Sequence, residues 1–211
     1  MRVSRTGCAV LIVGGVIAAA VSVAALVVAA ISYARNTATL FALVERDDVD
    51  AARAHLQRAG GTRVRDADGN TPLFFARSRA MAELLVSHGA RVDAKSSWGC
   101  TPLHFASGHC AVEVVEYLLS QGADVSDRDY LGREALHWAV ASAVTSSETG
   151  FDFWFCGPDV VKNASDVVQV LLRHGAALNA RDSLGRTPLR RADDNEADEL
   201  VTLLQSLGGV P

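Results

Sequence analysis

The hydrophobic and polar positions divide the chain into two parts of different character. From Cys8 to Tyr33, 26 residues pass without a charged side chain. A helix of that length reaches roughly 39 Å at about 1.5 Å per residue, which exceeds the ~30 Å hydrocarbon core of a bilayer. The pattern predicts a transmembrane signal-anchor helix over residues 8–33, after a short basic flank over residues 1–7.

The charges on either side of this segment predict its orientation. Arg2 and Arg5 precede it and Arg35 follows closely, so the positive-inside rule keeps the N-terminus in the cytoplasm and exports the rest. A cleaved signal peptide is the alternative and would release a soluble exported protein, although signal-peptide apolar cores usually run only about 7 to 15 residues. Lys occurs twice and Arg eighteen times among many Ala, Val and Gly residues, a skew typical of GC-rich bacterial genomes. We therefore expect a single-pass protein of a bacterial inner membrane, with residues 34–211 in the periplasm.

Residues 34–211 show short apolar helix patterns that repeat along the chain. The glycines that open each copy lie 30, 33 and 53 residues apart, at Gly69, Gly99, Gly132 and Gly185. The glycines that close the copies lie 33 and 53 residues apart, at Gly89, Gly122 and Gly175. A period of 33 residues accounts for both series, if the second copy is about three residues short between its helices and the fourth carries an additional block of about 20 residues. Such a period is typical of stacked repeat proteins.

The residue types in each copy predict two helices and a tight turn. Pro72, Pro102 and Pro188 stand where a helix begins, since proline suits the first helical position. The preceding threonine can cap that helix through its hydroxyl, and the closing glycine suits the left-handed conformation that ends a helix. No copy can bury its apolar face alone, so neighbouring copies must stack.

These motifs resemble the ankyrin repeat, whose signature is Gly-x-Thr-Pro-Leu-His-x-Ala with a 33-residue period. The cleanest copy begins Gly99-Cys100-Thr101-Pro102-Leu103-His104, and the resemblance covers about Thr37 to Leu207. It implies an all-α ankyrin-repeat solenoid of helix-turn-helix units with β-hairpin fingers. We expect about five repeats, over residues 37–65, 66–95, 96–128, 129–181 and 182–211. The last is expected to be a capping repeat, because Asp193–Glu199 is polar where an internal repeat would be apolar.

The fourth copy departs from the pattern through an insertion over about residues 142–162. Four aromatic side chains gather in it: Phe151, Phe153, Trp154 and Phe155. Insertions in repeat proteins form loops, often on a functional face, so these rings are candidate partner contacts. Alternatively, they fold back over an apolar patch on the neighbouring helices.

The cysteines suggest one covalent link. Cys110 lies between the two helices of the third copy, and Cys156 lies at the equivalent place in the fourth. In an oxidising compartment the two would form a disulfide that pins the insertion. Cys100 is expected to be exposed and unpaired. A metal site built from His109, Cys110 and Cys156 lacks the paired close spacing of structural zinc sites.

Three hairpin tips carry apolar residues where polar ones are usual. These are Trp98, Leu131 and Leu184, with Tyr130 beside them. The resemblance implies binding of proteins through the tips and the concave helix face, and Trp and Tyr are favoured anchors at interfaces. The alternative is that Leu131 and Leu184 pack against the next hairpin.

Charge and motif content exclude several other functions. Outside residues 1–35 the chain carries 17 basic and 24 acidic side chains, a poor match for a nucleic-acid backbone. No nucleophile–base set, glycine-rich phosphate loop or pair of carboxylates in a predicted cleft appears, and His104 and His137 occupy the family's structural histidine position. We therefore expect no enzyme activity, no cofactor, no metal and no small-molecule substrate. The sequence predicts a membrane-tethered scaffold that binds a partner protein, or alternatively an immunity or inhibitor protein that neutralises a toxin or enzyme.

Overall fold

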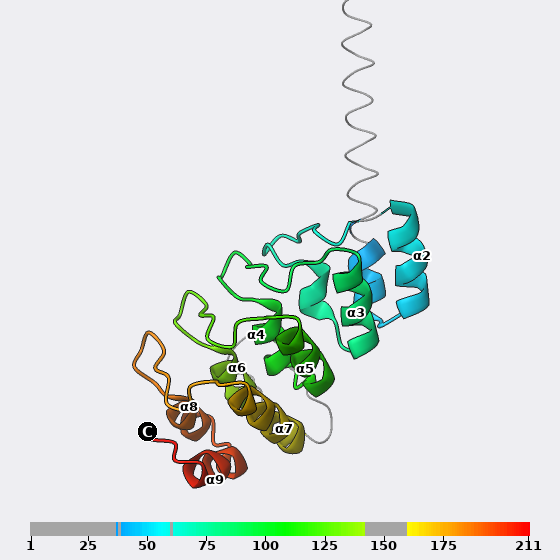
Figure 1. Cartoon of the computed structure of the whole chain (residues 1–211). Helices are drawn as coiled ribbons and strands as arrows, with labels where there is room; N and C mark the ends of the chain where they lie inside the picture. Colours follow the sequence, from blue (N-terminus) through cyan, green and yellow to red (C-terminus); the bar gives the residue numbers. More distant parts are fainter. Residues whose placement is uncertain (1–36, 38, 60, 142–159) are drawn as a thin grey trace, which may run out of the picture. The chain divides into compact units, whose positions relative to one another are not determined.

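The computed structural model describes residues 37, 39–59, 61–141 and 160–211 (Figure 1). Contacts divide the chain into two units, Met1–Thr39 and Leu40–Pro211, and nearly all described residues belong to the second. Within the described ranges, no helix combines the length and the apolar character that crossing a membrane requires. Residues 8–33 lie outside those ranges, so the transmembrane helix stays a prediction.

The unit Leu40–Pro211 consists of paired helices joined by turns. After a helix that includes residues 40–45, the elements are α2 (Val49–Ala59), η1 (Pro72–Phe75), α3 (Arg79–Ser87), α4 (Pro102–Gly108), α5 (Val112–Ser120), α6 (Ala135–Ala141), α7 (Val160–Arg173), α8 (Pro188–Asp194) and α9 (Asp198–Ser206). The described residues contain helices and turns but no strand, which agrees with the predicted all-α class.

The helices form two layers. The first layer contains η1, α4, α6 and α8, where α4 contacts η1 and α6, and α6 contacts α8. The second layer contains α2, α3, α5, α7 and α9, each in contact with the next. The loops between successive pairs project together on one side of this unit (Figure 1).

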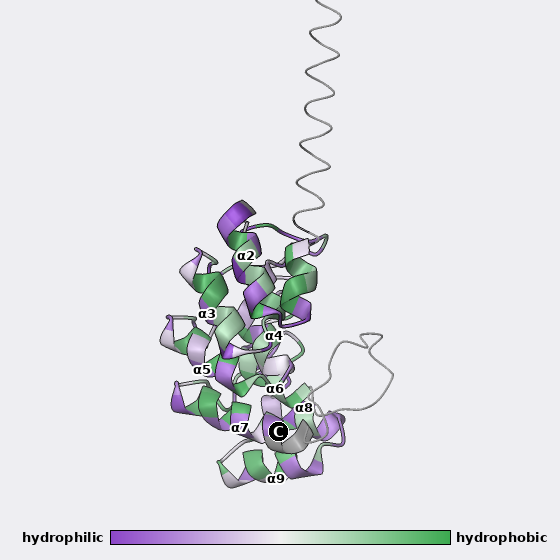
Figure 2. Cartoon of the chain, turned by 90° about the vertical axis from the view of Figure 1, so that its right-hand side faces the viewer, coloured by the Kyte–Doolittle hydropathy of each residue, from purple (hydrophilic) through white to green (hydrophobic). Residues whose placement is uncertain are grey.

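One hydrophobic core runs between the layers from Leu40 to Leu204. The motif leucines of the first layer are buried, at Leu73, Leu103, Leu136 and Leu189. Buried leucines of the second layer belong to the same core, at Leu85, Leu118, Leu171 and Leu204. Each helix carries both apolar and hydrophilic segments (Figure 2). Burying one leucine side chain contributes about 1.5–3 kcal/mol, and because the core crosses every pair, neighbouring repeats share this stabilisation.

The helix ends follow the proline and glycine pattern. Pro72, Pro102 and Pro188 occupy the first positions of η1, α4 and α8. At the other end, Gly89, Gly122 and Gly175 have φ of +89°, +87° and +89°. The residue after each glycine donates its N–H to a leucine carbonyl of the preceding helix at 3.0 Å, so one carbonyl in the last turn of each of α3, α5 and α7 is satisfied beyond the end of the helix.

The prediction that the fingers are β-hairpins is wrong in one respect: these segments contain no strands. They are tight turns over residues 66–70, 96–100, 129–133 and 182–186. In each turn the N–H of the first residue donates to the carbonyl of the fifth, at 2.9–3.1 Å. A pair of β-strands would need a second backbone hydrogen bond here, donated by the N–H of the fifth residue. That N–H donates instead to the side chain of the first residue, which is Asp66, Ser96, Asp129 or Asp182.

Candidate protein-binding surface

Four large apolar side chains stand out from three consecutive turns. We call them the turn ridge: Trp98, Tyr130, Leu131 and Leu184, with 65%, 73%, 56% and 74% of their surface exposed. The other exposed large hydrophobic side chains in the described ranges, Leu207 and Val210, reach only 45% and 46%. At these exposures Leu131 and Leu184 are not covered by a neighbouring turn. Grouped exposed apolar residues of this kind are typical of binding surfaces.

Buried polar side chains hold the ridge in place. Asp129 Oδ1 accepts the N–H of Leu131 at 2.9 Å, and Asp182 Oδ1 accepts that of Leu184 at 2.9 Å. Ser96 Oγ accepts the N–H of Trp98 at 3.2 Å. Although burial opposes it, hydrogen bonds from Arg133 keep the pKa of Asp129 below its ordinary value. The carboxylate therefore stays ionised, and charged acceptors make the stronger hydrogen bonds.

Neighbouring turns are also joined to one another. Tyr130 N–H donates to the carbonyl of Trp98 at 3.0 Å, and Ser183 N–H donates to that of Leu131 at 2.9 Å. The Tyr130 ring lies against Gly99, where an added Cβ would stand 2.6 Å from Cδ1 of the ring. The ridge is therefore built before a partner arrives, and such preorganisation lowers the entropy cost of binding.

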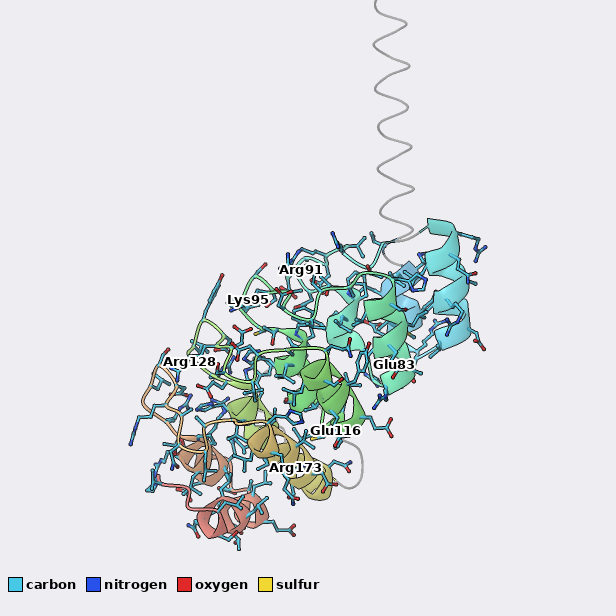
Figure 3. The ribbon with its side chains drawn as sticks, viewed as in Figure 1. Glu83, Arg91, Lys95, Glu116, Arg128 and Arg173 are labelled. Carbon is cyan, nitrogen blue, oxygen red and sulfur yellow. The ribbon has the colours of Figure 1, made fainter. Side chains whose placement is uncertain are left out.

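Charges beside the ridge are largely neutralised by ion pairs. Figure 3 shows Arg91, Lys95 and Arg128 on the loops and Glu83, Glu116 and Arg173 on the second layer. Among the loop cations, Lys95 pairs with Asp127 at 2.7 Å and Arg91 with Asp93 at 2.7 Å. Arg128 pairs with Glu134 at 2.9 Å. The surroundings of the ridge thus favour an apolar partner surface over a polyanion.

The other predicted contact residues, Phe151, Phe153, Trp154 and Phe155, lie outside the described residues. Cys156 lies outside them too. Cys110 is disulfide-bonded, but its pairing with Cys156 stays a prediction.

Cys100 corrects one expectation. It is free but buried, not exposed, with 3% of its surface accessible. As the fifth residue of its turn it packs with Phe74 and Ala94. Burial raises the pKa of its thiol to about 11, so the thiol is protonated and unreactive at neutral pH.

A row of aromatic rings along the first layer was not predicted. This aromatic ladder consists of Phe41, in the helix before α2, and of Phe75, Phe105 and Trp138 in the first layer, with centroid separations of 5.8, 6.0 and 5.7 Å between successive rings. All four are partly exposed. The sequence does contain a signal for this row, because each of the four rings immediately precedes the motif alanine of its repeat. An alignment of the repeats with one another would have shown an aromatic residue at this position in four successive copies.

Cationic side chains follow the last ring. The Arg133 guanidinium lies 4.6 Å from the centroid of the Trp138 ring, and Trp138 Nε1 donates to Asp129 Oδ2 at 3.0 Å. In α8 the ladder column holds Arg191, whose guanidinium lies 3.8 Å from Asp182 Oδ2.

The motif histidines have structural partners. Thr101 N–H donates to His104 Nδ1 at 3.1 Å, and His104 Nε2 lies 3.0 Å from the carbonyl of Arg133. His137 Nε2 lies 3.2 Å from the carbonyl of Arg186. Each ring therefore joins one repeat to the next. In the part of the chain that the structure describes, no group of three His, Cys, Asp or Glu side chains could hold a metal ion.

Comparison with known proteins agrees with this architecture. A family model described as Ankyrin repeats (3 copies) matches residues 26–129. Human neurogenic locus notch homolog protein 1 is 31% identical over 144 residues, which is 66% of this chain and 5% of that protein. The E3 ubiquitin-protein ligase Ufd4 of Drosophila melanogaster is 30% identical over 166 residues, 77% of this chain and 5% of the ligase.

The repeated motif, the paired helices in two layers and the family match together define an ankyrin-repeat protein, and the chain belongs to that family. It spans only about 5% of the length of these relatives. Repeats of this class form protein–protein interaction domains.

Proposed function

We propose that the chain is a non-catalytic scaffold whose turn ridge binds a partner protein. The observation that carries the proposal is the exposure of Trp98, Tyr130, Leu131 and Leu184 on three adjacent, mutually bonded turns. Aromatic anchors at the centre of an interface supply most of its binding energy. The partly exposed ladder along the first layer offers a second contact region.

Affinity capture followed by a binary measurement tests this proposal. The full chain and a Trp98→Asp/Leu131→Asp/Leu184→Asp variant are used to capture partners in cells, and the partner found is then purified. A matched control, Gln121→Asp/Gln169→Asp/Gln205→Asp, adds the same charge at exposed positions on the second-layer side. We expect the Kd to rise at least a hundredfold in the ridge variant, since each buried anchor contributes 2 kcal/mol or more. Equal affinity of all three proteins would refute the ridge as the binding surface.

We further propose that residues 8–33 tether the domain to a membrane, with the repeats in the bacterial periplasm. The support is the uncharged run of 26 residues after two arginines. The intact mass of the protein recovered from the membrane fraction distinguishes the tether from a cleaved signal peptide. A mass lacking the first 30 or so residues would replace the tether with a soluble exported form.

In that compartment, a bond between Cys110 and Cys156 would hold the insertion against the third repeat. The support is the equivalent position of the two cysteines in adjacent repeats and the bonded state of Cys110. Peptide mapping without reduction tests the pairing, and recovery of a free Cys156 thiol would rule it out.

The alternative function is that of an immunity or inhibitor protein. A captured partner with toxin or hydrolytic activity that the chain suppresses on binding would favour it over a passive scaffold.

A further inference from the structure

The aromatic ladder ends on positive charge instead of a fifth ring. Arg191 occupies the ladder position of α8, and 16% of its side-chain surface is exposed. The charged groups that act on it are the guanidinium groups of Arg133 and Arg186 and the carboxylates of Asp129 and Asp182. Both of these carboxylate side chains are 1% exposed. Three cations therefore face two anions, which leaves about one positive charge uncompensated.

Arg191 carries the uncompensated charge. Arg133 lies 2.6 Å from Asp129, and Arg186 lies 3.0 Å from Asp182. The carboxylate of Asp182, already paired with Arg186, is also the one that lies near Arg191. Its Oδ2 is 3.8 Å from Arg191 Nη1, which is beyond hydrogen-bond distance. Arg191 Nε has no hydrogen-bond partner at all. A largely buried cation without a full partner destabilises the folded chain. An external carboxylate that pairs with Arg191 would therefore contribute more binding free energy than one that pairs with an exposed arginine.

The ionisation of Arg191 fits this interpretation. Burial, reinforced by Arg133 and Arg186, lowers the pKa of its guanidinium to about 10. The group is thus still charged at neutral pH, and an added anion would raise the pKa again.

We propose that the aromatic ladder and Arg191 bind an acidic–apolar peptide segment of the partner protein, with apolar side chains against Phe75 and Phe105 and an Asp or Glu carboxylate on Arg191. This inference rests on the proposed function, namely that the repeat stack binds a protein. A polyanion is disfavoured because residues 36–211 carry 24 acidic against 17 basic side chains. A single carboxylate beside apolar side chains matches both parts of the surface.

The neighbouring residue provides a matched control. Arg190 lies in the same helix and is half-exposed, but it pairs with Asp194 at 3.0 Å and with Asp193 at 3.5 Å. Replacing Arg190 or Arg191 with Met removes the same charge, and only the second change removes the uncompensated cation.

Peptide selection tests the proposal directly. A random 12-residue peptide library displayed on phage is selected on the detergent-solubilised full chain, after depletion on empty micelles. The Kd of the recovered peptide, and of its copy with Asp and Glu replaced by Asn and Gln, is then measured for the natural chain, Arg191→Met and Arg190→Met. We expect recovered peptides rich in acidic and aromatic residues, with about tenfold or more weaker binding after either the amide replacement or Arg191→Met. The two losses should not add, whereas Arg190→Met should leave the Kd unchanged.

Three results would overturn the proposal: no recovered peptide, peptides without acidic enrichment, or equal losses on amide replacement in the natural and Arg191→Met chains. The ridge variant separates this proposal from the proposed function. If Trp98→Asp/Leu131→Asp/Leu184→Asp abolishes partner capture but keeps peptide affinity, the ridge and the ladder are separate surfaces. Loss of peptide affinity in Arg191→Met with unchanged circular dichroism excludes unfolding as the cause.

Discussion

At the scale of single residues, each turn depends on one buried polar side chain and one glycine. The side chain takes two backbone N–H groups, as Asp129 does for Leu131 and Arg133. The glycine adopts a left-handed conformation that costs other residues about 1–2 kcal/mol. Gly99 and Gly185 share this conformation, with φ of +75° and +76°, but differ in their surroundings. Tyr130 lies against Gly99, whereas nothing lies within 4 Å of the Cβ position at Gly185.

This pair of glycines gives the first prediction. Gly99→Ala should lower the free energy of unfolding by about 1 kcal/mol more than Gly185→Ala, because only the first change also displaces a ring. Urea titration of both variants measures the difference. In a Tyr130→Ala background the difference should largely disappear, and its persistence would show that the ring is not responsible.

The motif histidines predict a pH dependence of stability. Burial lowers the pKa of His104 and of His137 below the ordinary value of 6.5. A group whose pKa is lower in the folded state contributes stability above its unfolded pKa and loses it as pH falls. The free energy of unfolding should therefore decline below about pH 6.5, by at most about 1.4 kcal/mol per pH unit for each histidine. Urea unfolding between pH 8 and pH 5 should show a shallower decline in a His104→Gln/His137→Gln variant, and an unchanged slope would contradict this assignment.

At the scale of elements, the hydroxyl of the threonine before each proline makes different hydrogen bonds in different repeats. Thr187 Oγ1 accepts the N–H of Arg190 at 3.1 Å and donates to the carbonyl of Val210 at 2.6 Å. It therefore caps α8 and holds the C-terminal tail. Thr71 Oγ1, at the same position before η1, is buried and has no hydrogen-bond partner.

Replacing each threonine with the similarly shaped valine tests this difference. Thr187→Val should cost about 1–2 kcal/mol, because it removes a cap and leaves polar groups without their partner. Amide exchange at Gly208–Val210 should accelerate in the same variant. Thr71→Val should be nearly neutral or stabilising, and a loss as large as that of Thr187→Val would contradict the account.

The sequence predicts these elements well where the local rule decides the structure. Proline at the first helical position and glycine after the second helix both lie where they were expected. Strands were expected and turns were found, because the side chains of Asp66, Ser96, Asp129 and Asp182 take the N–H groups that a strand pair would use. The ladder and the uncompensated Arg191 depend on which side chains meet across repeats, which a motif compared with its family consensus does not reveal.

At the scale of the whole domain, a continuous core and a continuous row of turns coexist. The core makes neighbouring repeats depend on one another, and the backbone bonds between turns transmit that order to the exposed side chains. The arrangement of the turn ridge therefore depends on the whole stack and not on any single repeat, because its four exposed side chains, Trp98, Tyr130, Leu131 and Leu184, come from three turns. The central claim is that a partner protein touches these side chains.

Site-specific photocrosslinking in cells tests that claim most directly. A benzophenone amino acid is placed at Leu131 on the ridge or, as the control, at Gln169 on the exposed side of α7. We predict one discrete crosslinked product from position 131 and none from position 169, with the partner peptide identified by mass. Crosslinking from position 169 alone would place the binding surface on the second layer and contradict the account.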